Sequence, residues 1–526
     1  MIRVRQVKVP ITDNNEQTII LKIATKLNVS IKKIKNYNIT KKSIDARDKK
    51  NIFYVYEFDV LVENENDILR KNKSKDILKT PEESYKFLIK GTLKMKRKPV
   101  IVGSGPAGLF CAYLLAENGY NPIIIERGEK IEDRVNTVEK FFKDNILNKN
   151  SNVQFGEGGA GTFSDGKLNT LTKDKYNRGK KVFEIFVENG APKEILYENK
   201  PHIGTDLLRG VIINIRNKII EMGGVFRYGT CLTNLIIKDS KITGIELNNK
   251  EILNCDSLVL AIGHSARDTF KMLLSNNVDI TSKPFAVGIR IQHPQKLINE
   301  AQYGKNKNLP NASYKLVYNT KSKRGVYSFC MCPGGYVVNS SSDLRGTVIN
   351  GMSNYKRDSI NANSAIVVTV SEKDYGTGPL DGIKFQEKLE SLAYELGDGK
   401  IPTQLYIDYK NNRNTKQFGS VKPVFKGDYN FTNINDIFPN YINQALVEGI
   451  EYFSKKIKDF NLDDAIISAV ESRTSSPVRI NRNEEFMSNI YGIYPCGEGS
   501  GYSGGITTSA IDGVKVAEKI AQIYMN

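Results

Sequence analysis

Long apolar segments are absent from this sequence. No run approaches the ~20 consecutive apolar residues that a helix needs to cross a lipid bilayer. The first eight residues alternate charged and apolar side chains, so they lack the continuous apolar block of a secretory signal. These absences argue against helical membrane spans and predict a cytoplasmic protein. The oligomeric state stays open.

Cysteine is also scarce, with six residues in a chain of 526. Their spacing fits neither a zinc module nor a disulfide framework, so we expect no metal site. Cys330-Met331-Cys332 is the exception, and it could be a redox dithiol or a structural pair at the end of an apolar strand. We favour the structural pair, because one intervening residue strains a disulfide and no neighbour in the sequence obviously stabilises a thiolate.

Histidine occurs three times. His264 follows an apolar run ending in Gly263, where α/β folds bind ligands, so we regard it as a candidate for cofactor or substrate contact. A buried structural histidine remains the alternative. His202 lies just before a predicted helix whose start could bind an anion, whereas His293, next to Pro294, is predicted to be structural.

The bulk composition is that of a globular protein, with 40% hydrophobic and 25% charged residues. A length of 526 residues suggests about three domains. The net charge of +18 would suit an anionic partner such as nucleic acid. Because the lysines are dispersed along the chain, we favour a compositional origin for this charge.

The strongest motif is Gly103-Ser104-Gly105-Pro106-Ala107-Gly108, which follows an apolar run at residues 100–102. A helix is predicted over residues 107–118, and a second apolar run ends at Glu126, 18 residues after Gly108. Such a turn presents backbone N–H groups and a helix N-terminus to a pyrophosphate, and the acid can accept hydrogen bonds from a ribose. The spacing therefore predicts a dinucleotide site.

Patterning along the chain predicts an α/β protein in which a Rossmann-like domain is interrupted by another domain. The N-terminal region contains predicted strands over residues 2–9, 34–45 and 53–62 and a helix over residues 14–27. We predict, in chain order, a small α+β domain, the first part of the Rossmann-like domain, an inserted α+β domain, and the second part of the Rossmann-like domain, at residues 1–95, 96–280, 281–472 and 473–526.

Glycine is concentrated in two further segments. Residues 156–166 contain five glycines, which argues for close approach of the backbone to a planar ligand or a phosphate. Lys167 follows them and could polarise a ligand carbonyl or hold a carboxylate, although a solvated loop charge remains equally open. Near the C-terminus, Gly497-Glu498 closes an apolar strand, and residues 504–507 open the last predicted helix.

These segments recur, in this order, in a known group of proteins. Residues 103–108, Glu126, residues 259–263 and residues 497–498, with the C-terminal helix, resemble the two-dinucleotide-binding-domain flavoproteins of the glutathione reductase type. More narrowly, almost the whole chain is similar to uncharacterised FAD-dependent dehydrogenases often labelled "NAD(FAD)-utilizing". That narrower resemblance depends on four segments, at residues 156–168, 286–290, 330–335 and 496–502.

The resemblance implies an FAD fold and leaves the substrate unnamed. It implies that Leu232 contacts the adenine through its backbone and that the helix after Gly505 meets the pyrimidine edge of the flavin. The candidate catalytic residues are Lys167 and His264. The predicted FAD-binding residues are Gly103, Gly105, Pro106, Ala107, Gly108, Glu126, Arg127, Gly159, Gly161, Thr162, Leu232, Ala261, Gly263, Gly497, Glu498, Gly504, Gly505 and Ile506.

We therefore predict an FAD-dependent oxidoreductase that transfers a hydride through flavin N5 and acts on a small molecule. No second nucleotide domain is visible, because the glycines at residues 376–382 have the wrong spacing and no strand directly before them. NAD(P)H is thus expected as a transient electron donor at most. Two alternatives remain: a flavin-dependent tRNA-modifying enzyme, motivated by the net charge, and a non-catalytic FAD-binding sensor or scaffold.

Overall fold

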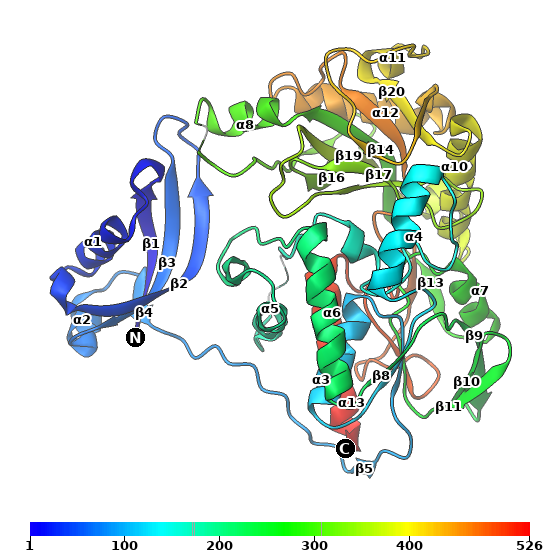
Figure 1. The fold of residues 1–526 in the computed structure, drawn as a ribbon, viewed down its shortest axis with the longest axis horizontal. Coiled ribbons are helices and arrows are strands. Elements are labelled where there is room, and N and C mark those ends of the chain that lie inside the picture. The colour runs from blue at the N-terminus through cyan, green and yellow to red at the C-terminus, as the bar shows by residue number, and fades with distance from the viewer. Residues whose placement is uncertain (171, 173, 307) are drawn as a thin grey trace.

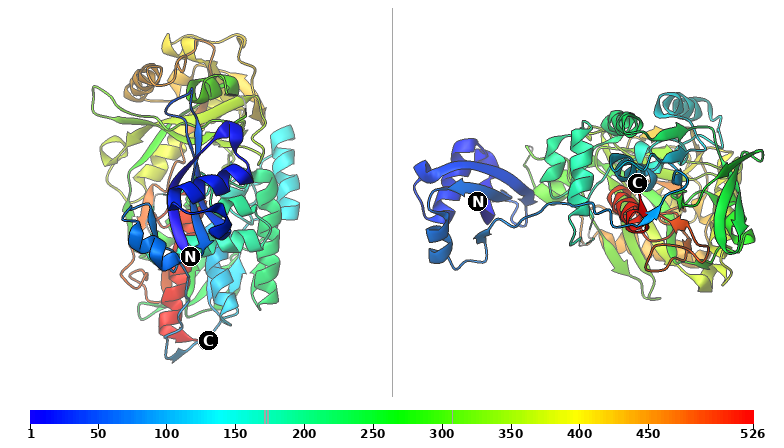
Figure 2. Two further views of the ribbon diagram at one scale, coloured as in Figure 1. Left: turned by 90° about the vertical axis from the view of Figure 1, so that its left-hand side faces the viewer. Right: turned by 90° about the horizontal axis from the view of Figure 1, so that it is seen from below.

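The computed structural model describes residues 1–170, 172, 174–306 and 308–526. Figure 1 shows an N-terminal unit, a central unit built around a parallel sheet, and a third unit built around a larger mixed sheet. The N-terminal unit stands to one side, whereas the other two lie against each other (Figures 1 and 2).

The N-terminal unit is a four-stranded antiparallel sheet in the order β2-β3-β1-β4 with α1 packed on it. Helix α1 is capped by Asn15, whose side chain accepts a hydrogen bond from the N–H of Thr18, and the helix buries Ile19, Ile23 and Leu27. The predicted strands and helix of this region are confirmed. The elements are β1 (Ile2–Pro10), α1 (Glu16–Leu27), β2 (Ile34–Asp45), β3 (Phe53–Val62), α2 (Glu65–Lys71) and β4 (Ile77–Lys79).

Contacts at several points hold this unit to the rest of the chain. The segment after β4 leads to β5 (Leu93–Lys94), which pairs with β26 (Tyr524–Met525) beside the C-terminus (Figure 1). On the other side, the backbone N–H of Lys42 donates to the carbonyl of Tyr197 at 2.7 Å, and its Nζ lies 2.8 Å from Glu198 Oε1.

The central unit contains a five-stranded parallel sheet in the order β25-β12-β6-β7-β8. Alternate residues of each strand face opposite sides, so Ile101 packs into the helical layer and Val100 into the layer of β9–β11. The strands are β6 (Val100–Val102), β7 (Ile123–Ile125), β8 (Val225–Arg227), β9 (Leu232–Lys238), β10 (Lys241–Leu247), β11 (Glu251–Asn254), β12 (Leu258–Leu260) and β25 (Ile493–Pro495). The helices are α3 (Pro106–Glu117), α4 (Ile131–Asp144), α5 (Arg178–Glu188), α6 (Thr205–Glu221), α7 (Arg267–Ser275) and α13 (Ile506–Ile523).

This unit is assembled from two distant stretches of chain. Strand β25 and helix α13 follow the third unit in sequence, yet β25 pairs with β12 and α13 packs against α3. A Cβ on Gly513 would lie 2.1 Å from the carbonyl oxygen of Ala107, so only glycine permits this approach. The α/β class and the Rossmann-like domain are therefore confirmed.

The third unit is a seven-stranded mixed sheet in the order β15-β16-β19-β14-β23-β20-β22. Its strands are β14 (Phe285–Pro294), β15 (Val317–Asn319), β16 (Gly325–Cys332), β19 (Asn361–Val370), β20 (Ile401–Leu405), β22 (Tyr429–Phe431) and β23 (Ile466–Glu471). Its helices are α8 (Gln295–Tyr303), α9 (Glu372–Tyr375), α10 (Asp381–Gly397), α11 (Tyr406–Lys410) and α12 (Asn440–Phe453). Gly376 and Gly378 lie in the turn before α10, as the sequence predicted, and Gly382 lies in the first turn of that helix.

Two small sheets complete the fold. One, in the order β18-β17-β21, contains β17 (Tyr336–Asn339), β18 (Ile349–Met352) and β21 (Phe425–Lys426). The other pairs β13 (Ile280–Ser282) with β24 (Val478–Ile480), where the chain leaves and re-enters the central unit. Short 3-10 helices lie at Ile11–Asp13, Ile31–Lys33, Ala160–Phe163, Lys193–Leu196 and Ile434–Asp436.

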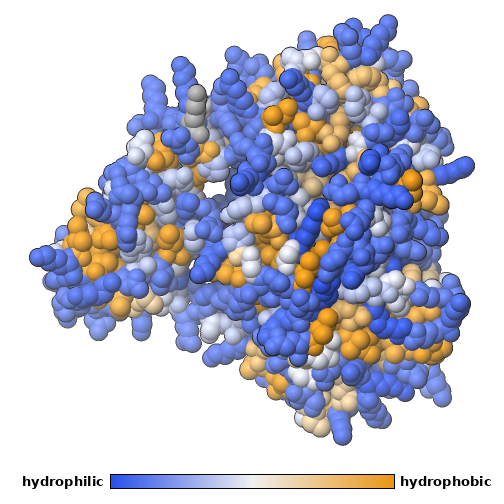
Figure 3. Space-filling model, in the orientation of Figure 1, coloured by the Kyte–Doolittle hydropathy of each residue, from blue (hydrophilic) through white to orange (hydrophobic). Residues whose placement is uncertain are grey.

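The surface carries many charged residues, and hydrophilic residues prevail over the face shown in Figure 3. Within the part of the chain that the structure describes, no helix combines the length and apolar character required for crossing a bilayer.

The contact between α13 and α3 gives a test of the assembly. Gly513→Ala places a methyl group against the backbone of α3, so we expect a loss of about 1–3 kcal/mol in the free energy of unfolding. Gly210, exposed in the interior of α6, is the matched control: a Cβ there meets nothing within 4 Å. Gly210→Ala should stabilise by up to about 1 kcal/mol. Chemical denaturation measures both, and equal effects would contradict the packing described.

Candidate functional site

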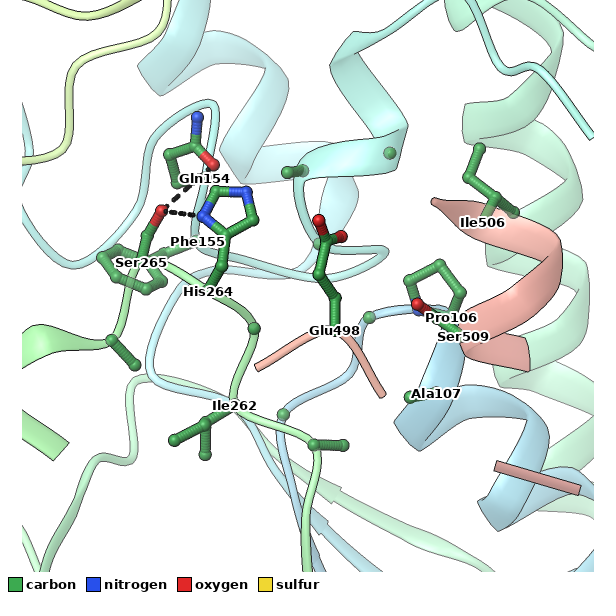
Figure 4. Close-up of a pocket in the computed structure, with 18 of the residues that line it drawn as sticks. Pro106, Ala107, Gln154, Phe155, Ile262, His264, Ser265, Glu498, Ile506 and Ser509 are labelled. Atoms are coloured by element: carbon green, nitrogen blue, oxygen red, sulfur yellow. Dashed lines mark hydrogen bonds between the residues drawn. The ribbon is translucent and has the colours of Figure 1, made fainter. Parts of the chain in front are cut away.

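A cavity of about 260 Å³ lies at the carboxyl ends of β6, β7, β12 and β25. This is the edge of a parallel sheet where ligands bind. Both stretches of the central unit line it, and residues of β16, β18 and the segment after β23 close it from the third unit. Figure 4 shows the convergence: His264 and Ser265 follow β12, Glu498 follows β25, and Ile506 begins α13.

The strand order gives the cavity two distinct ends. Strand β6, with its glycine turn, lies between β7, which ends before Glu126, and β12 and β25, beyond which Glu498 lies. With about 4.8 Å between neighbouring strands, the ends of β7 and β25 are on the order of 14 Å apart. That span suits an extended dinucleotide better than a mononucleotide.

The backbone around the glycine turn faces open space. Gly103 has φ of 98°, a left-handed conformation that favours glycine. A Cβ on Gly105 would meet only Gly159 Cα, at 3.7 Å, and a Cβ on Gly263 or Gly505 would meet nothing within 4 Å. The first-turn N–H groups of α3 and α13 have no partners within their helices. Space and donors for a diphosphate are therefore both present.

Glu126 faces the cavity and also connects several segments of the cavity wall through hydrogen bonds. Its Oε2 accepts hydrogen bonds from the N–H and Oγ of Ser104, at 2.9 and 2.7 Å. Its Oε1 accepts from the N–H groups of Gly128 and Gly156, at 2.9 and 3.1 Å. These bonds use the roughly four acceptor positions of a carboxylate, so a ribose hydroxyl would share an oxygen that is already bonded. The ribose contact stays a prediction.

Arg134 of α4 stabilises the glycine-rich loop. Its side chain is fully buried and packs under the loop. The guanidinium donates to five backbone carbonyls at 2.6–3.2 Å, and its nearest acidic residues act only through their charge. It also lies over the ring of Phe163 at 4.9 Å. The five carbonyl groups belong to Asn152, Val153, Gly156, Glu157 and Gly159.

His264 is held as a neutral imidazole. Its Nδ1 shares a hydrogen bond of 2.9 Å with Ser265 Oγ, which in turn donates to Gln154 (Figure 4). Burial, together with the charges of Arg473 and Arg267, lowers the pKa of His264 to about 3. At neutral pH this side chain therefore acts as a polar, uncharged group on the cavity wall.

Glu498 has the opposite shift. Burial raises the pKa of its carboxyl to about 7, against smaller effects of the Gly505 N–H and the Lys283 charge. The side chain points into the cavity between His264 and the start of α13 (Figure 4). A carboxyl group with this pKa can hold or release a proton near neutral pH.

Lys167 is a partly buried cation rather than a solvated loop charge, with 29% of its side chain exposed. Its Nζ lies 3.5 Å from Asp165 and 3.9 Å from Cys332 Sγ. Burial is the largest single effect and lowers the pKa of the Lys167 ammonium, but the charge of Asp165 and the two nearby cysteines together raise the pKa overall. Arg357 and Ser353 also bind Asp165, so a network anchored in the third unit fixes this end of the loop.

The structure brings most of the predicted site residues to this one cavity. The predicted residues that line it are Gly103, Gly105, Pro106, Ala107, Glu126, Arg127, Gly159, Gly161, Lys167, Leu232, Ala261, Gly263, His264, Glu498, Gly505 and Ile506. It thus collects residues from segments up to 403 positions apart in the sequence.

Four predicted residues lie outside the cavity wall and support it. A Cβ on Gly108 would lie 1.9 Å from the carbonyl oxygen of Gly103, so Gly108 permits the helix–strand packing. Thr162 is buried, and its carbonyl accepts from Thr205 Oγ1. The N–H of Gly497 donates to Asp512 at 2.8 Å, and Gly504 lines a neighbouring cavity.

Sequence reasoning missed the buried charges around the site. Arg267 and Arg473 both bind Glu390 at 2.7–3.1 Å and lie beside His264. Arg134 gave no sequence signal, because an isolated arginine on a helix usually lies at the surface. Neither of the other two histidines lines this cavity: His202 and His293 each share a hydrogen bond with a backbone carbonyl, of Tyr355 and Phe460 respectively.

The structure adds two cations to the surroundings of the cysteine pair that its sequence neighbours do not supply. Lys167 approaches Cys332, and Arg290 Nη1 donates to the carbonyl of Cys330 at 3.1 Å. Both cations lie far from the pair in sequence, so no local pattern could reveal them.

Comparisons with known proteins agree with this picture. Residues 284–474 match the family described as "FAD-dependent protein, C-terminal domain-like", and residues 101–149 match the "NAD(P)-binding Rossmann-like domain". Residues 1–61 match a domain of unknown function. An uncharacterised protein from Clostridium beijerinckii is 48% identical over 531 positions, covering 99% of each chain.

Among solved structures, similar chains include glycine oxidase from Bacillus cereus, with 11% identity and a TM-score of 0.34 over 81% of this chain and 95% of that one. L-proline dehydrogenase from P. horikoshii has 14% identity and a TM-score of 0.33 over 81% of this chain and 94% of that one. The family matches and the cavity together identify FAD as the cofactor.

The raised pKa of Glu498 predicts a pH-dependent stability difference. A carboxyl whose folded pKa is about 7, against an ordinary value of 4.5, contributes stability below pH 4.5 that is lost as the pH rises through 7. Glu498→Gln keeps a neutral side chain throughout. Between pH 4.5 and 8, the free energy of unfolding of the FAD-free wild type should therefore fall by about 2 kcal/mol relative to that of Glu498→Gln. This value is smaller than the full pKa shift would give, because the side chain is only partly buried. Denaturation curves at both pH values test this, and parallel pH profiles would refute it.

Arg134 predicts a second effect. Lysine has three N–H donors instead of five, so Arg134→Lys must leave loop carbonyls unpaired. We expect a loss of about 2–4 kcal/mol in stability and weaker FAD retention. Arg209→Lys is the matched control, because Arg209 lies over the same Phe163 ring at 4.8 Å while its buried Nε has no hydrogen-bond partner in the described structure. Denaturation measures the stability of both variants, and the FAD that remains after gel filtration measures retention. Similar losses of stability and of bound FAD in the two variants would contradict the role given to Arg134.

Proposed function

The chain belongs to the same family as the Clostridium beijerinckii protein, and we propose that it is an FAD-dependent oxidoreductase acting on a small molecule. One observation carries the proposal. The cavity joins the dinucleotide-binding edge of the central sheet to titratable side chains from the third unit. A protein that only stored FAD would have no need of acid, base and thiol groups at that end.

The residues divide the cavity into functional parts. Glu126 and Arg127 lie at the adenosine end, the turn at residues 103–108 would hold the diphosphate, and Glu498 and Ile506 lie at the ring end. The N-terminus of α13 would stabilise negative charge on a reduced ring by about 0.3–1 kcal/mol. When bound, FAD supplies two-electron chemistry through hydride transfer at N5.

The chain's own groups would position the substrate and move its proton. Lys167 provides a fixed cation that can bind a carboxylate or polarise a carbonyl, and Asp165 keeps it charged. Glu498 can accept or deliver a proton near neutral pH, whereas His264 stays neutral and offers only hydrogen bonds. The third unit covers this end and would limit the access of water.

A nicotinamide donor would have to reach the same cavity. The described residues contain one five-stranded parallel sheet with a dinucleotide turn, so NAD(P)H would be a transient visitor rather than the occupant of its own domain. We also place the chain within the glutathione-reductase-type flavoproteins, on the order of its FAD-binding segments. The tRNA-modifying and non-catalytic alternatives gain no support from the family matches.

The test combines cofactor binding with cofactor reduction. Wild-type protein should retain FAD through gel filtration, and Gly105→Val should lose it, because the added side chain occupies the open space beside the turn. Gly210→Ala should retain it. Anaerobic mixing of the holoprotein with NADH, NADPH and a panel of small metabolites should then bleach the bound flavin with at least one donor. Retained FAD that no donor reduces would overturn the oxidoreductase proposal in favour of a sensor or scaffold.

A further inference from the structure

Cys330 and Cys332 lie at the end of β16, where the strand departs from regular pairing. Phe329 pairs with Ala365 and Cys332 with Asn363, so the register shifts between them. Cys330 has φ of 43°, a left-handed conformation that is uncommon for residues other than glycine. Such a bulge re-aims side chains and is over-represented beside active sites.

The bulge gives the two thiols different surroundings. Cys330 lines the cavity and is partly exposed, whereas Cys332 is fully buried behind it. The Sγ of Cys332 donates a hydrogen bond to the carbonyl oxygen of Cys330 at 3.3 Å. One thiol therefore faces the cofactor space, and the second is held against the first.

Positive charge surrounds the pair. Lys167 Nζ lies 3.9 Å from Cys332 Sγ, and Arg290, paired with Glu471 at 3.0 Å, donates to the carbonyl of Cys330. The neighbouring Cys332 thiol lowers the pKa of Cys330 well below its ordinary value, and Cys330 raises the pKa of Cys332. By contrast, burial raises the pKa of Cys111, Cys255 and Cys496, which lie in apolar cores.

We propose that Cys330 and Cys332 form a redox-active dithiol–disulfide pair that exchanges two electrons with FAD bound in the same cavity. The inference rests on the proposed function, because that function supplies the reduced FAD. A disulfide that spans one residue constrains the unfolded chain very little, so such a bond would contribute little to the stability of the fold. Short, strained disulfides are instead the ones that are readily reduced.

The exchange balances without a further reagent. The anionic reduced form of FAD gives up two electrons and one proton and becomes oxidised FAD. The S–S bond breaks as it accepts the electron pair, Cys332 takes the proton as a thiol, and Cys330 remains a thiolate. The reverse step forms the S–S bond and returns the same electrons and proton. The product, one thiolate and one thiol, matches the two environments that the structure provides.

Electron counting tests this inference with the holoprotein. The protein is first oxidised with oxidised glutathione, freed of it, and then titrated anaerobically with dithionite. Wild type should take up two electron pairs per FAD, and its flavin absorbance should fall more slowly because the electrons partition between flavin and disulfide. Cys330→Ser and Cys332→Ser should each take up one pair. Cys231→Ser, a partly buried cysteine outside the cavity wall, should behave as wild type.

Differential alkylation followed by peptide mass spectrometry gives an independent measurement on the wild type. Residues 330 and 332 should be protected in the oxidised protein and labelled after reduction. Uptake of one pair by wild type, or labelling of both cysteines after oxidation, would overturn the inference even if the serine variants fail to fold. Dithionite reduces FAD chemically, so this titration does not depend on the donor test. A protein without FAD would contradict the proposed function. A protein that retains FAD but takes up only one electron pair would contradict only the present inference.

Discussion

The buried guanidinium of Arg134 is the interaction on which the cofactor site depends. Its guanidinium donates to five backbone carbonyls between residues 152 and 159, three of which share Nη1, so this segment has a single conformation although its glycines would permit many. Glu126 then fastens the same loop to the glycine turn through the N–H of Gly156. Burying an arginine without a direct carboxylate partner is costly, and the number of hydrogen bonds offsets that cost.

Buried charge also organises the opposite end of the cavity. Glu390 binds Arg267 of the central unit and Arg473 of the third unit, and burial, reinforced by the charges of these two arginines, keeps His264 neutral. Arg290 and Glu471 form a second fully buried pair beneath the cysteines. Both clusters touch the cavity wall, through Arg473 itself and through the hydrogen bond from Arg290 to the Cys330 carbonyl, so buried charge influences the protonation of the groups that line the cavity.

Much of the fold followed from local patterns. The turn at residues 103–108 and the strands around it could be predicted because each depends on neighbouring residues and on backbone geometry. The elements of the N-terminal unit followed from alternation and helical spacing for the same reason. The environment of Cys330 could not be predicted, because Lys167 lies 163 positions earlier in the chain. Nor could that of Glu498, whose pKa depends on burial by distant segments.

The sequence by itself determined the dinucleotide-binding turn and the glycines that form it, since backbone conformation is encoded within a few residues. Only the tertiary structure decided which side chains confront the cofactor and in which protonation state. Electrostatic interactions depend on distance and on exclusion of water, and both are set by segments that meet only after folding. The chemistry of the site therefore depends on how the units assemble, whereas the type of cofactor can be predicted from the sequence.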